Sequence, residues 1–123
     1  MTEEKIQFEL LHIGINRFGE EDNRKTAMLL AELFGFTFRE TPGSYFVNEQ
    51  IEVCNKSIGT HGHFAFGTQD VEKAVAYLEG RGIEFDRENA RRDESGRIRL
   101  IFAKEEIAGF AFHLSLKPAE KKD

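Results

Sequence analysis

A weak internal repeat is the feature that most constrains how this chain can fold. LHIGIN at residues 11–16 aligns with GHFAFG at residues 62–67, so that His12 falls on His63. Further along, AELFGFTF aligns with LEGRGIEF. Each copy has the pattern of a strand, a helix and three more strands. One copy has a single helix to cover one face of its sheet. Two copies therefore predict an α+β fold, in which two βαβββ modules form one open cup-shaped mixed sheet with helices outside.

The first copy, module one, is expected over about residues 6–56. Its helix starts with acidic residues, which suit the positive end of a helix dipole, and Gly35 is a predicted C-cap. Asn48 and Glu49 are expected at the tip of a hairpin. The expected elements are a strand at 8–16, the helix at 19–35, a strand at 36–41, and hairpin strands at 44–47 and 50–56.

The second copy, module two, is expected over about residues 60–117. Its helix has Val71, Ala74, Val75 and Leu78 on one face. The expected elements are a strand at 61–67, the helix at 68–82, a strand at 82–86, a charged loop at 87–96, and strands at 97–104 and 109–116. The length of 123 residues predicts one domain over residues 1–123.

Three of the four histidines lie in predicted strands, on the faces away from the phenylalanines. His12, His63 and His113 each have a small residue two positions away on the same face, and Glu52 lies on the polar face of its strand. Imidazole and carboxylate groups suit Zn²⁺, Mn²⁺, Fe²⁺, Co²⁺ or Ni²⁺. The spacing leaves two interpretations open: a metal site, or hydrogen-bonded residues in a polar cleft without a metal.

The arginines near the end of module two also have two interpretations. Arg97 and Arg99 share one strand face and could bind a carboxylate or a phosphate. Alternatively, they form a solvated charge stripe that discourages edge-strand aggregation. Arg91, Arg92 and Arg97 are interpreted as solvated, whereas Arg99 fits both interpretations equally.

Other polar residues fit structural roles better. His61 is interpreted as a solvent-exposed residue at a strand entry, and Cys54 as a buried thiol in preference to a soft metal neighbour. Glu105 and Glu106 lie in a predicted turn and are expected to be solvated, with a general base as the alternative.

Composition excludes several classes of function. The net charge of −5 and the pI of about 5.4 argue against non-specific nucleic-acid binding or binding to an anionic membrane. No apolar run approaches the roughly 18 residues of a membrane span. The single cysteine excludes an intrachain disulfide and fits a reducing compartment. The acidic N-terminus lacks the apolar stretch of a signal peptide, so a cytoplasmic location is expected.

These residues give the chain a resemblance to the vicinal oxygen chelate superfamily, which includes glyoxalases, bleomycin-resistance proteins and extradiol dioxygenases. The resemblance runs from LHIGIN to GFAFHLSL and implies a divalent metal in the cup. His12 and His63 match the first-strand ligands of the two modules, and Glu52 matches the last-strand position of module one. His113 falls where many members have a glutamate, which is a departure, although histidine is also a good ligand.

Within that superfamily, the chain most resembles a small domain found with keto-hydroxyglutarate and keto-deoxy-phosphogluconate aldolases. The runs that carry this resemblance are GTHGHFAFGTQDVEKAVAYLEGRGIEF and IRLIFAKEEIAGFAFHLSL, and KEEIAGFAFHL is the most specific part. The resemblance implies a sugar-acid aldolase as a partner. The chain itself is too short for the roughly 250 residues of a (β/α)₈ barrel.

Two functions are therefore expected as alternatives. The first is a metal-dependent enzyme of the lyase, isomerase or dioxygenase type, acting on a small 2-oxo or hydroxy acid. In it, His12, Glu52, His63 and His113 hold the metal, and Glu52 and Arg99 act in catalysis. The second is a non-catalytic metabolite-binding or accessory module linked to a 2-keto-3-deoxy-phosphogluconate/4-hydroxy-2-oxoglutarate aldolase. A homodimer is expected in both cases, because the cup leaves its sheet edges open.

Overall fold

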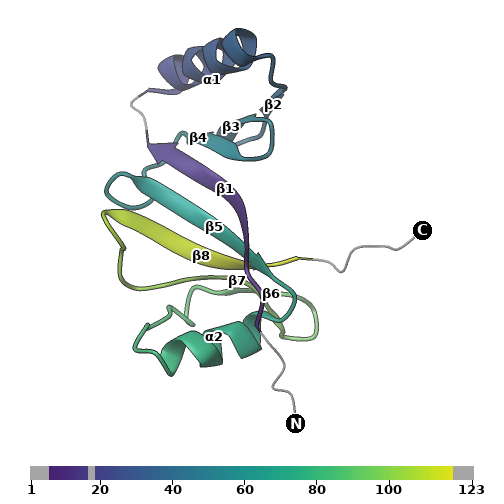
Figure 1. Cartoon of the computed structure of the whole chain (residues 1–123), viewed down its shortest axis with the longest axis vertical. Coiled ribbons are helices and arrows are strands. Elements are labelled where there is room, and N and C mark those ends of the chain that lie inside the picture. The colour runs from purple at the N-terminus through teal and green to yellow at the C-terminus, as the bar shows by residue number, and fades with distance from the viewer. Residues whose placement is uncertain (1–5, 17–18, 118–123) are drawn as a thin grey trace, which may run out of the picture.

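The computed structural model describes residues 6–16 and 19–117, and these form one eight-stranded mixed sheet with two helices (Figure 1). The expected domain limits at residues 1 and 123 lie outside the described residues. The strand order is β2-β3-β4-β1-β5-β8-β7-β6. The elements are β1 (Glu9–Asn16), α1 (Glu20–Phe34), β2 (Phe38–Glu40), β3 (Ser44–Val47), β4 (Ile51–Cys54), β5 (Gly62–Thr68), α2 (Val71–Glu79), β6 (Arg91–Arg92), β7 (Ile98–Phe102) and β8 (Phe110–Leu116).

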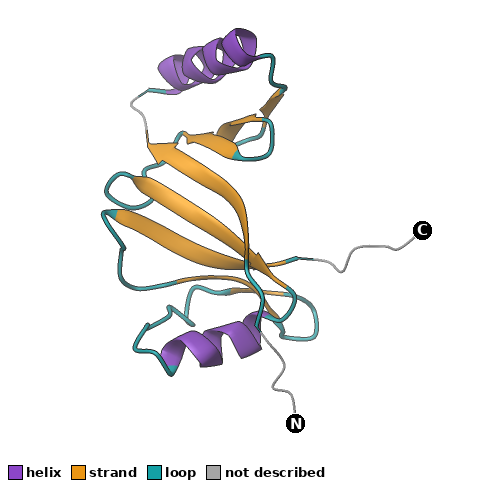
Figure 2. Ribbon diagram, viewed as in Figure 1, coloured by secondary structure: helices purple, strands orange, loops and turns teal. Residues whose placement is uncertain are grey.

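The two repeats form two halves of this sheet with the same arrangement. β1 pairs in parallel with β4 in the first half, and β5 pairs in parallel with β8 in the second half. The halves meet where β1 and β5 pair antiparallel at the centre of the sheet. Figure 2 shows the two helices at opposite ends, outside the sheet. This arrangement confirms the α+β fold of paired βαβββ modules.

Helix α1 packs on the first half of the sheet through small residues. Ala27 and Ala31 are buried against a cluster that includes Tyr45, Val47 and Val53. Gly35 follows the helix in the left-handed conformation, with φ 70°, and its N–H donates to the carbonyl of Ala31. Glycine adopts this conformation without a Cβ clash, so the predicted C-cap is confirmed.

Helix α2 packs on the second half of the sheet. Asp70 is the N-cap, and its carboxylate accepts a hydrogen bond from the backbone N–H of Lys73 at 3.0 Å. Three residues of the predicted helix face are buried, together with side chains of β7 and β8, and Leu78 is partly buried against them. The buried cluster contains Val71, Ala74, Val75, Phe85, Ile98, Ile101, Ala103, Phe112 and Leu114.

The segment between α2 and β7 differs from the expected pattern. Residues 82–86 form only an isolated bridge between Phe85 and Ala103, because the buried Phe85 ring anchors this segment in the core beneath α2. The expected charged loop contains the short strand β6 instead. Asp93 explains the strand, because its carboxylate accepts hydrogen bonds from the N–H groups of Ser95 and Arg97 and so turns the chain back along β7.

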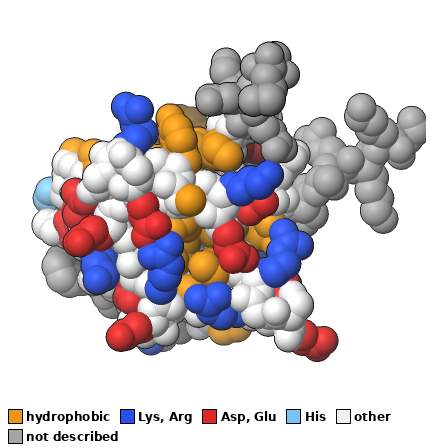
Figure 3. Space-filling view, turned by 90° about the horizontal axis from the view of Figure 1, so that it is seen from below, with side chains coloured by type: hydrophobic (Ala, Val, Ile, Leu, Met, Phe, Trp, Pro, Cys, Tyr) orange, Lys and Arg blue, Asp and Glu red, His pale blue; other side chains and the backbone are white. Residues whose placement is uncertain are grey.

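An apolar hollow of about 430 Å³ lies on the helix side of the second module. Figure 3, seen from below in the orientation of Figure 1, shows hydrophobic side chains between basic and acidic ones on this face. The hollow is lined by Phe8, Phe66, Leu78, Arg81, Ile83, Ile107, Phe112 and Leu114. Among the described residues, no helix is long and apolar enough to cross a membrane.

Candidate metal centre

The sheet register brings the predicted site residues together on the face opposite the helices. Gly14 of β1 is paired with Glu52 of β4 on one side and with His63 of β5 on the other. In the next row, Ala65 of β5 is paired with both His12 and His113. Paired residues of neighbouring strands point to the same face of a sheet. The two rows therefore place these four polar side chains, which are far apart in the sequence, above the central strands.

Gly14 makes the approach of His63 possible. A Cβ at position 14 would lie 2.0 Å from Cε1 and 2.2 Å from Nδ1 of His63. The imidazole therefore occupies the space above the glycine backbone, and no larger residue fits there in the present arrangement. The small residue two positions after His12 therefore has a specific steric role.

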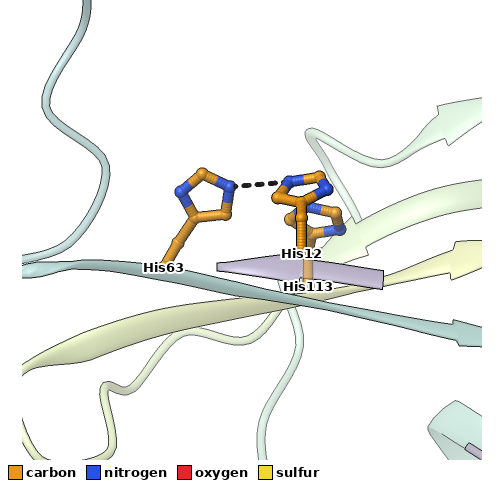
Figure 4. Close-up of side chains that lie close together, drawn as sticks. All are labelled: His12, His63 and His113. Atoms are coloured by element: carbon orange, nitrogen blue, oxygen red, sulfur yellow. Dashed lines mark hydrogen bonds between the residues drawn. The ribbon is translucent and has the colours of Figure 1, made fainter. Parts of the chain in front are cut away.

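Three ligand atoms from different strands form a nearly equilateral triangle. Nε2 of His12 lies 3.2 Å from Oε1 of Glu52 and 3.3 Å from Nε2 of His63 (Figure 4 shows the two imidazoles). Nε2 of His63 lies 3.3 Å from the same carboxylate oxygen. Three acceptor atoms at these distances would repel one another, so a proton or a cation between them is needed to offset the repulsion.

His113 completes the group from β8. Its ring stacks on that of His63, with the centroids 5.5 Å apart, and lies 6.0 Å from the ring of His12. One ligand atom from each of the three histidines lies within 4.8 Å of the other two. The Ser115 hydroxyl lies 3.1 Å from Nδ1 of His113, which leaves Nε2 for another partner.

Glu52 is ionised by its surroundings. Burial by itself would raise the pKa of this carboxyl group, but contacts with His12 and His63 and the hydrogen bond from Ser44 outweigh burial and lower the pKa below its ordinary value. The Ser44 hydroxyl donates to Oε2 of Glu52 at 2.7 Å, which leaves Oε1 facing the histidines. Glu52 is therefore an anion at neutral pH, the state in which a carboxylate binds a metal.

His113 is held in its neutral form. Burial, followed by the charges of His63 and His12, lowers its pKa from 6.5 to about 4. The side chain is only 6% exposed. A neutral imidazole has a lone pair available for a metal, so this histidine is in the ligand state at pH 7.

Cys54 shares the face of Glu52, as expected from the strand alternation. Its ligand atom lies within 4.8 Å of those of Glu52 and His63. However, burial and the neighbouring Glu52 carboxylate raise the pKa of its thiol to about 12. Thiolate is the form that binds metals, so these surroundings support the interpretation of a buried thiol.

The residues fit a divalent metal by the chemistry and the spacing of their donor atoms. Atoms 3.2–3.3 Å apart can all lie about 2.0–2.2 Å from one ion, which is the usual range for imidazole and carboxylate ligands of Zn²⁺. One feature departs from common metal sites: Nδ1 of His63 is buried without a hydrogen-bond partner among the residues that the structure describes. Metal-bound histidines usually donate from this second nitrogen to a neighbouring acceptor.

Several other predicted residues lie apart from this group. Arg99 is exposed and lines a hollow with Arg92, Asp93, Glu94 and Ser95. His61 is also exposed, and its backbone N–H donates to the carbonyl of Gly109. The Glu106 carboxylate accepts a hydrogen bond from the Thr60 hydroxyl at the surface.

Sequence reasoning missed three residues that contact the predicted ligands. Ser44 orients Glu52, as described above. The Phe46 ring lies 5.4 Å from that of His12, and the Phe102 ring lies 4.8 Å from that of His113. The alternation along β3 and β7 shows which residues share a face, but only the register shows that Phe46 pairs with Glu52 and Phe102 with His113.

Comparison with known proteins identifies the superfamily of this chain. The sequence model of the Glyoxalase/Bleomycin resistance protein/Dioxygenase superfamily matches residues 12–112. The chain belongs to this superfamily, which confirms the resemblance to it that the sequence predicts. The narrower resemblance to an aldolase-associated domain stays a prediction.

Solved structures with the same fold include a hypothetical protein from Bacillus halodurans, with a TM-score of 0.59, 14% identity, and coverage of 94% of this chain and 99% of that chain. A selenomethionine methylmalonyl-CoA epimerase has a TM-score of 0.57 and 16% identity, covering 95% and 100%. A Streptomyces coelicolor methylmalonyl-CoA epimerase variant, in complex with 2-nitronate-propionyl-CoA, has a TM-score of 0.53 and 18% identity, covering 86% and 92%. No curated protein matches the sequence.

Proposed function

We propose that this protein is a metal-dependent member of the superfamily that acts on a small 2-oxo or hydroxy acid. The observation that carries the proposal is the triangle formed by Nε2 of His12, Oε1 of Glu52 and Nε2 of His63, with edges of 3.2–3.3 Å. Family membership supports the proposal, because the sequence model of the superfamily matches residues 12–112, a span that contains all three residues.

The chain's own residues have distinct roles in this proposal. His12, Glu52 and His63 hold the ion, and His113 presents Nε2 from β8 as a fourth ligand. A divalent metal bound here supplies Lewis-acid stabilisation of negative charge on a substrate oxygen. The lowered pKa of Glu52 supports a ligand role over a general base, since a base works best when its pKa is near the operating pH. The expected catalytic role of Arg99 stays a prediction.

An acid substrate is supported by the chemistry of the site and by similar structures. A hard divalent metal with open positions binds two oxygens of a 2-oxo or hydroxy acid well. Two of the similar structures are epimerases with bound CoA esters, methylmalonyl-CoA in one and 2-nitronate-propionyl-CoA in the other. Lyase, isomerase and dioxygenase reactions are all compatible with Lewis-acid stabilisation. The proposal also includes a homodimer and a sugar-acid aldolase as a partner.

Metal content tests the proposal directly. Protein purified without an affinity tag is analysed for its elements, before and after incubation with Zn²⁺, Mn²⁺, Fe²⁺, Co²⁺ or Ni²⁺. We expect about one equivalent of metal in the wild type and less than about a tenth of that in the His12→Ala, His63→Ala double variant, since two of the ligands are lost. The His61→Ala variant is the matched control, because His61 is exposed and lies outside the group.

Turnover is then screened with a panel of 2-oxo and hydroxy acids on the metal-loaded protein. Equal metal content in the wild type and the double variant would contradict the metal site. Metal uptake without turnover, combined with tight binding of one of the acids, would instead favour the non-catalytic binding or accessory module.

A further inference from the structure

The short strand β6 places one arginine on the same face as the histidines. Arg91 is paired with Leu100 of β7, and Leu100 is paired with Ser115 of β8. Ser115 is two residues from His113 on the same strand and contacts its ring nitrogen. Paired residues share a face of the sheet, so Arg91 lies at the edge of the face that carries the candidate metal centre.

The neighbouring arginine belongs to the other face. Arg92 is paired with Ile98, whose side chain is buried in the cluster beneath α2. Its guanidinium donates to the carbonyl of Gly96 at 2.9 Å, and together with Arg99 it lines the hollow at the turn between β6 and β7. Arg92 is therefore a built-in comparison for Arg91, since it is adjacent, equally charged and faces away.

Arg91 also differs from the arginine on the opposite edge strand. Arg39 of β2 is on the histidine face as well, because it pairs with Phe46, which pairs with Glu52. The Glu49 carboxylate already neutralises Arg39 through hydrogen bonds of 2.8 and 3.1 Å. Arg91, in contrast, is exposed, and its guanidinium has no hydrogen bond or salt bridge within the part of the chain that the structure describes.

The position of β6 in the sheet sets the distance between Arg91 and the histidine group. The strand β6 is two strands beyond β8 and three beyond β5, which is about 10 Å and about 14 Å at the usual strand spacing. An extended arginine side chain covers part of this distance, and a short organic molecule that carries an acidic group at each end covers the remainder.

We infer that Arg91 is the anion subsite of this protein and binds a second anionic group of the substrate, a carboxylate or a phosphate, while the other end occupies the metal centre. The inference rests on the proposed function. It selects substrates with two acidic ends over simple 2-oxo monoacids. It also moves the anion-binding role from Arg99, which faces the hollow of the turn, to Arg91. The guanidinium fork matches both kinds of oxyanion.

Binding of three matched probes to the Zn²⁺-loaded protein tests the inference by calorimetry. Pyruvate has the 2-oxo acid end alone, 2-oxoglutarate adds a carboxylate, and 2-oxo-4-phosphonobutanoate carries a phosphonate in place of that carboxylate. We expect the diacid that binds better to have a Kd at least about 10-fold lower than that of pyruvate. A charge-assisted hydrogen bond to the second acidic group stabilises the complex by about this much. The preferred diacid identifies carboxylate or phosphate as the natural group.

Variants separate Arg91 from its neighbours. Arg91→Gln is expected to reduce the preference for the diacid to within about 2-fold of pyruvate, with pyruvate affinity and zinc content unchanged, because only the remote charge pair is lost. Arg92→Gln and Arg99→Gln are expected to keep the full preference. Loss of the preference in Arg99→Gln instead of Arg91→Gln would overturn the inference, and so would equal affinity of all probes for the wild type.

A readout without metal distinguishes failure of this inference from failure of the proposed function. Glutarate is titrated onto the metal-free protein, and the Nε–H signal of Arg91 is followed by ¹⁵N NMR, with the Arg92 signal as the reference. A saturable shift of the Arg91 signal alone supports the anion subsite even if the protein takes up no zinc. Absence of that shift, together with normal zinc uptake and pyruvate binding, would overturn the subsite and leave the metal centre intact.

Discussion

At the scale of single residues, the candidate centre depends on the different partners of the two oxygens of the Glu52 carboxylate. Oε2 of Glu52 accepts from Ser44, and Oε1 faces His12 and His63. Ser44 is fixed in turn by Thr41, whose hydroxyl lies 2.9 Å from that of Ser44 and 3.1 Å from its carbonyl. This chain of contacts selects one orientation of the carboxylate before any ion binds, which is the role of residues behind metal ligands.

Replacing Ser44 with alanine is therefore expected to weaken metal binding by about 10–100-fold, the usual effect of losing a partner of a metal ligand. The carboxylate then rotates more freely, and its pKa rises because one hydrogen bond to the anion is lost. The measurement is a competition titration against a chelator of known affinity. Ser57→Ala is the control, because Ser57 is exposed. Matching affinities for the two variants would show that Ser44 has no part in orienting Glu52.

At the scale of secondary-structure elements, the pairing of β1 with β5 brings the two modules into one site. Gly14 and His63 are opposite each other in this pair, and the imidazole lies over the glycine. The sequence predicted which faces carry the histidines, because period-2 alternation is visible in each strand alone. It could not predict that Gly14 must stay a glycine, since the contact depends on the register between strands far apart in the chain.

Gly14→Ala is expected to expel the His63 ring, because the new Cβ would lie 2.0 Å from Cε1. We expect a loss of about 1–3 kcal/mol in the free energy of unfolding, as is typical of overpacking, and at least ~10-fold weaker metal binding. Urea unfolding and the chelator titration measure the two effects. Gly43→Ala is the matched control, since a Cβ there would meet nothing within 4 Å. A Gly14→Ala variant that binds metal like the control would contradict the steric role of Gly14.

At the scale of the whole molecule, the paired-module fold could be predicted because the repeat fixes both halves with one pattern. The error at residues 82–96 had a local cause, because Phe85 is buried from an irregular segment and a two-residue strand has no periodicity to detect. The edge strands β2 and β6 have only three and two residues. Short edges disfavour edge-to-edge pairing, so the predicted homodimer would have to form through another surface.

The whole molecule also responds to pH through His113. The pKa of this histidine is about 4 in the folded chain and ordinarily 6.5, so between these values the unfolded chain binds the extra proton. The free energy of unfolding of the metal-free protein is therefore expected to fall as the pH is lowered from about 6.5 to about 4, by at most ~1.4 kcal/mol per pH unit for one proton. The pKa of Glu52 is lowered in the folded chain, so protonation of Glu52 reduces the stability only below its ordinary pKa of 4.5. That loss falls largely outside the range between pH 4 and pH 6.5.

Urea unfolding at a series of pH values, compared between wild type and His113→Gln, isolates this proton. The variant keeps a polar side chain but cannot take up the proton. The slope of its free energy of unfolding against pH is therefore expected to be smaller than that of the wild type, by at most the ~1.4 kcal/mol per pH unit that one proton contributes. His61→Gln should follow the wild type, because His61 is exposed and separate from the cluster. Parallel curves for wild type and His113→Gln would mean that His113 is not held neutral by its burial, and its assignment as a ready metal ligand would lose its electrostatic support.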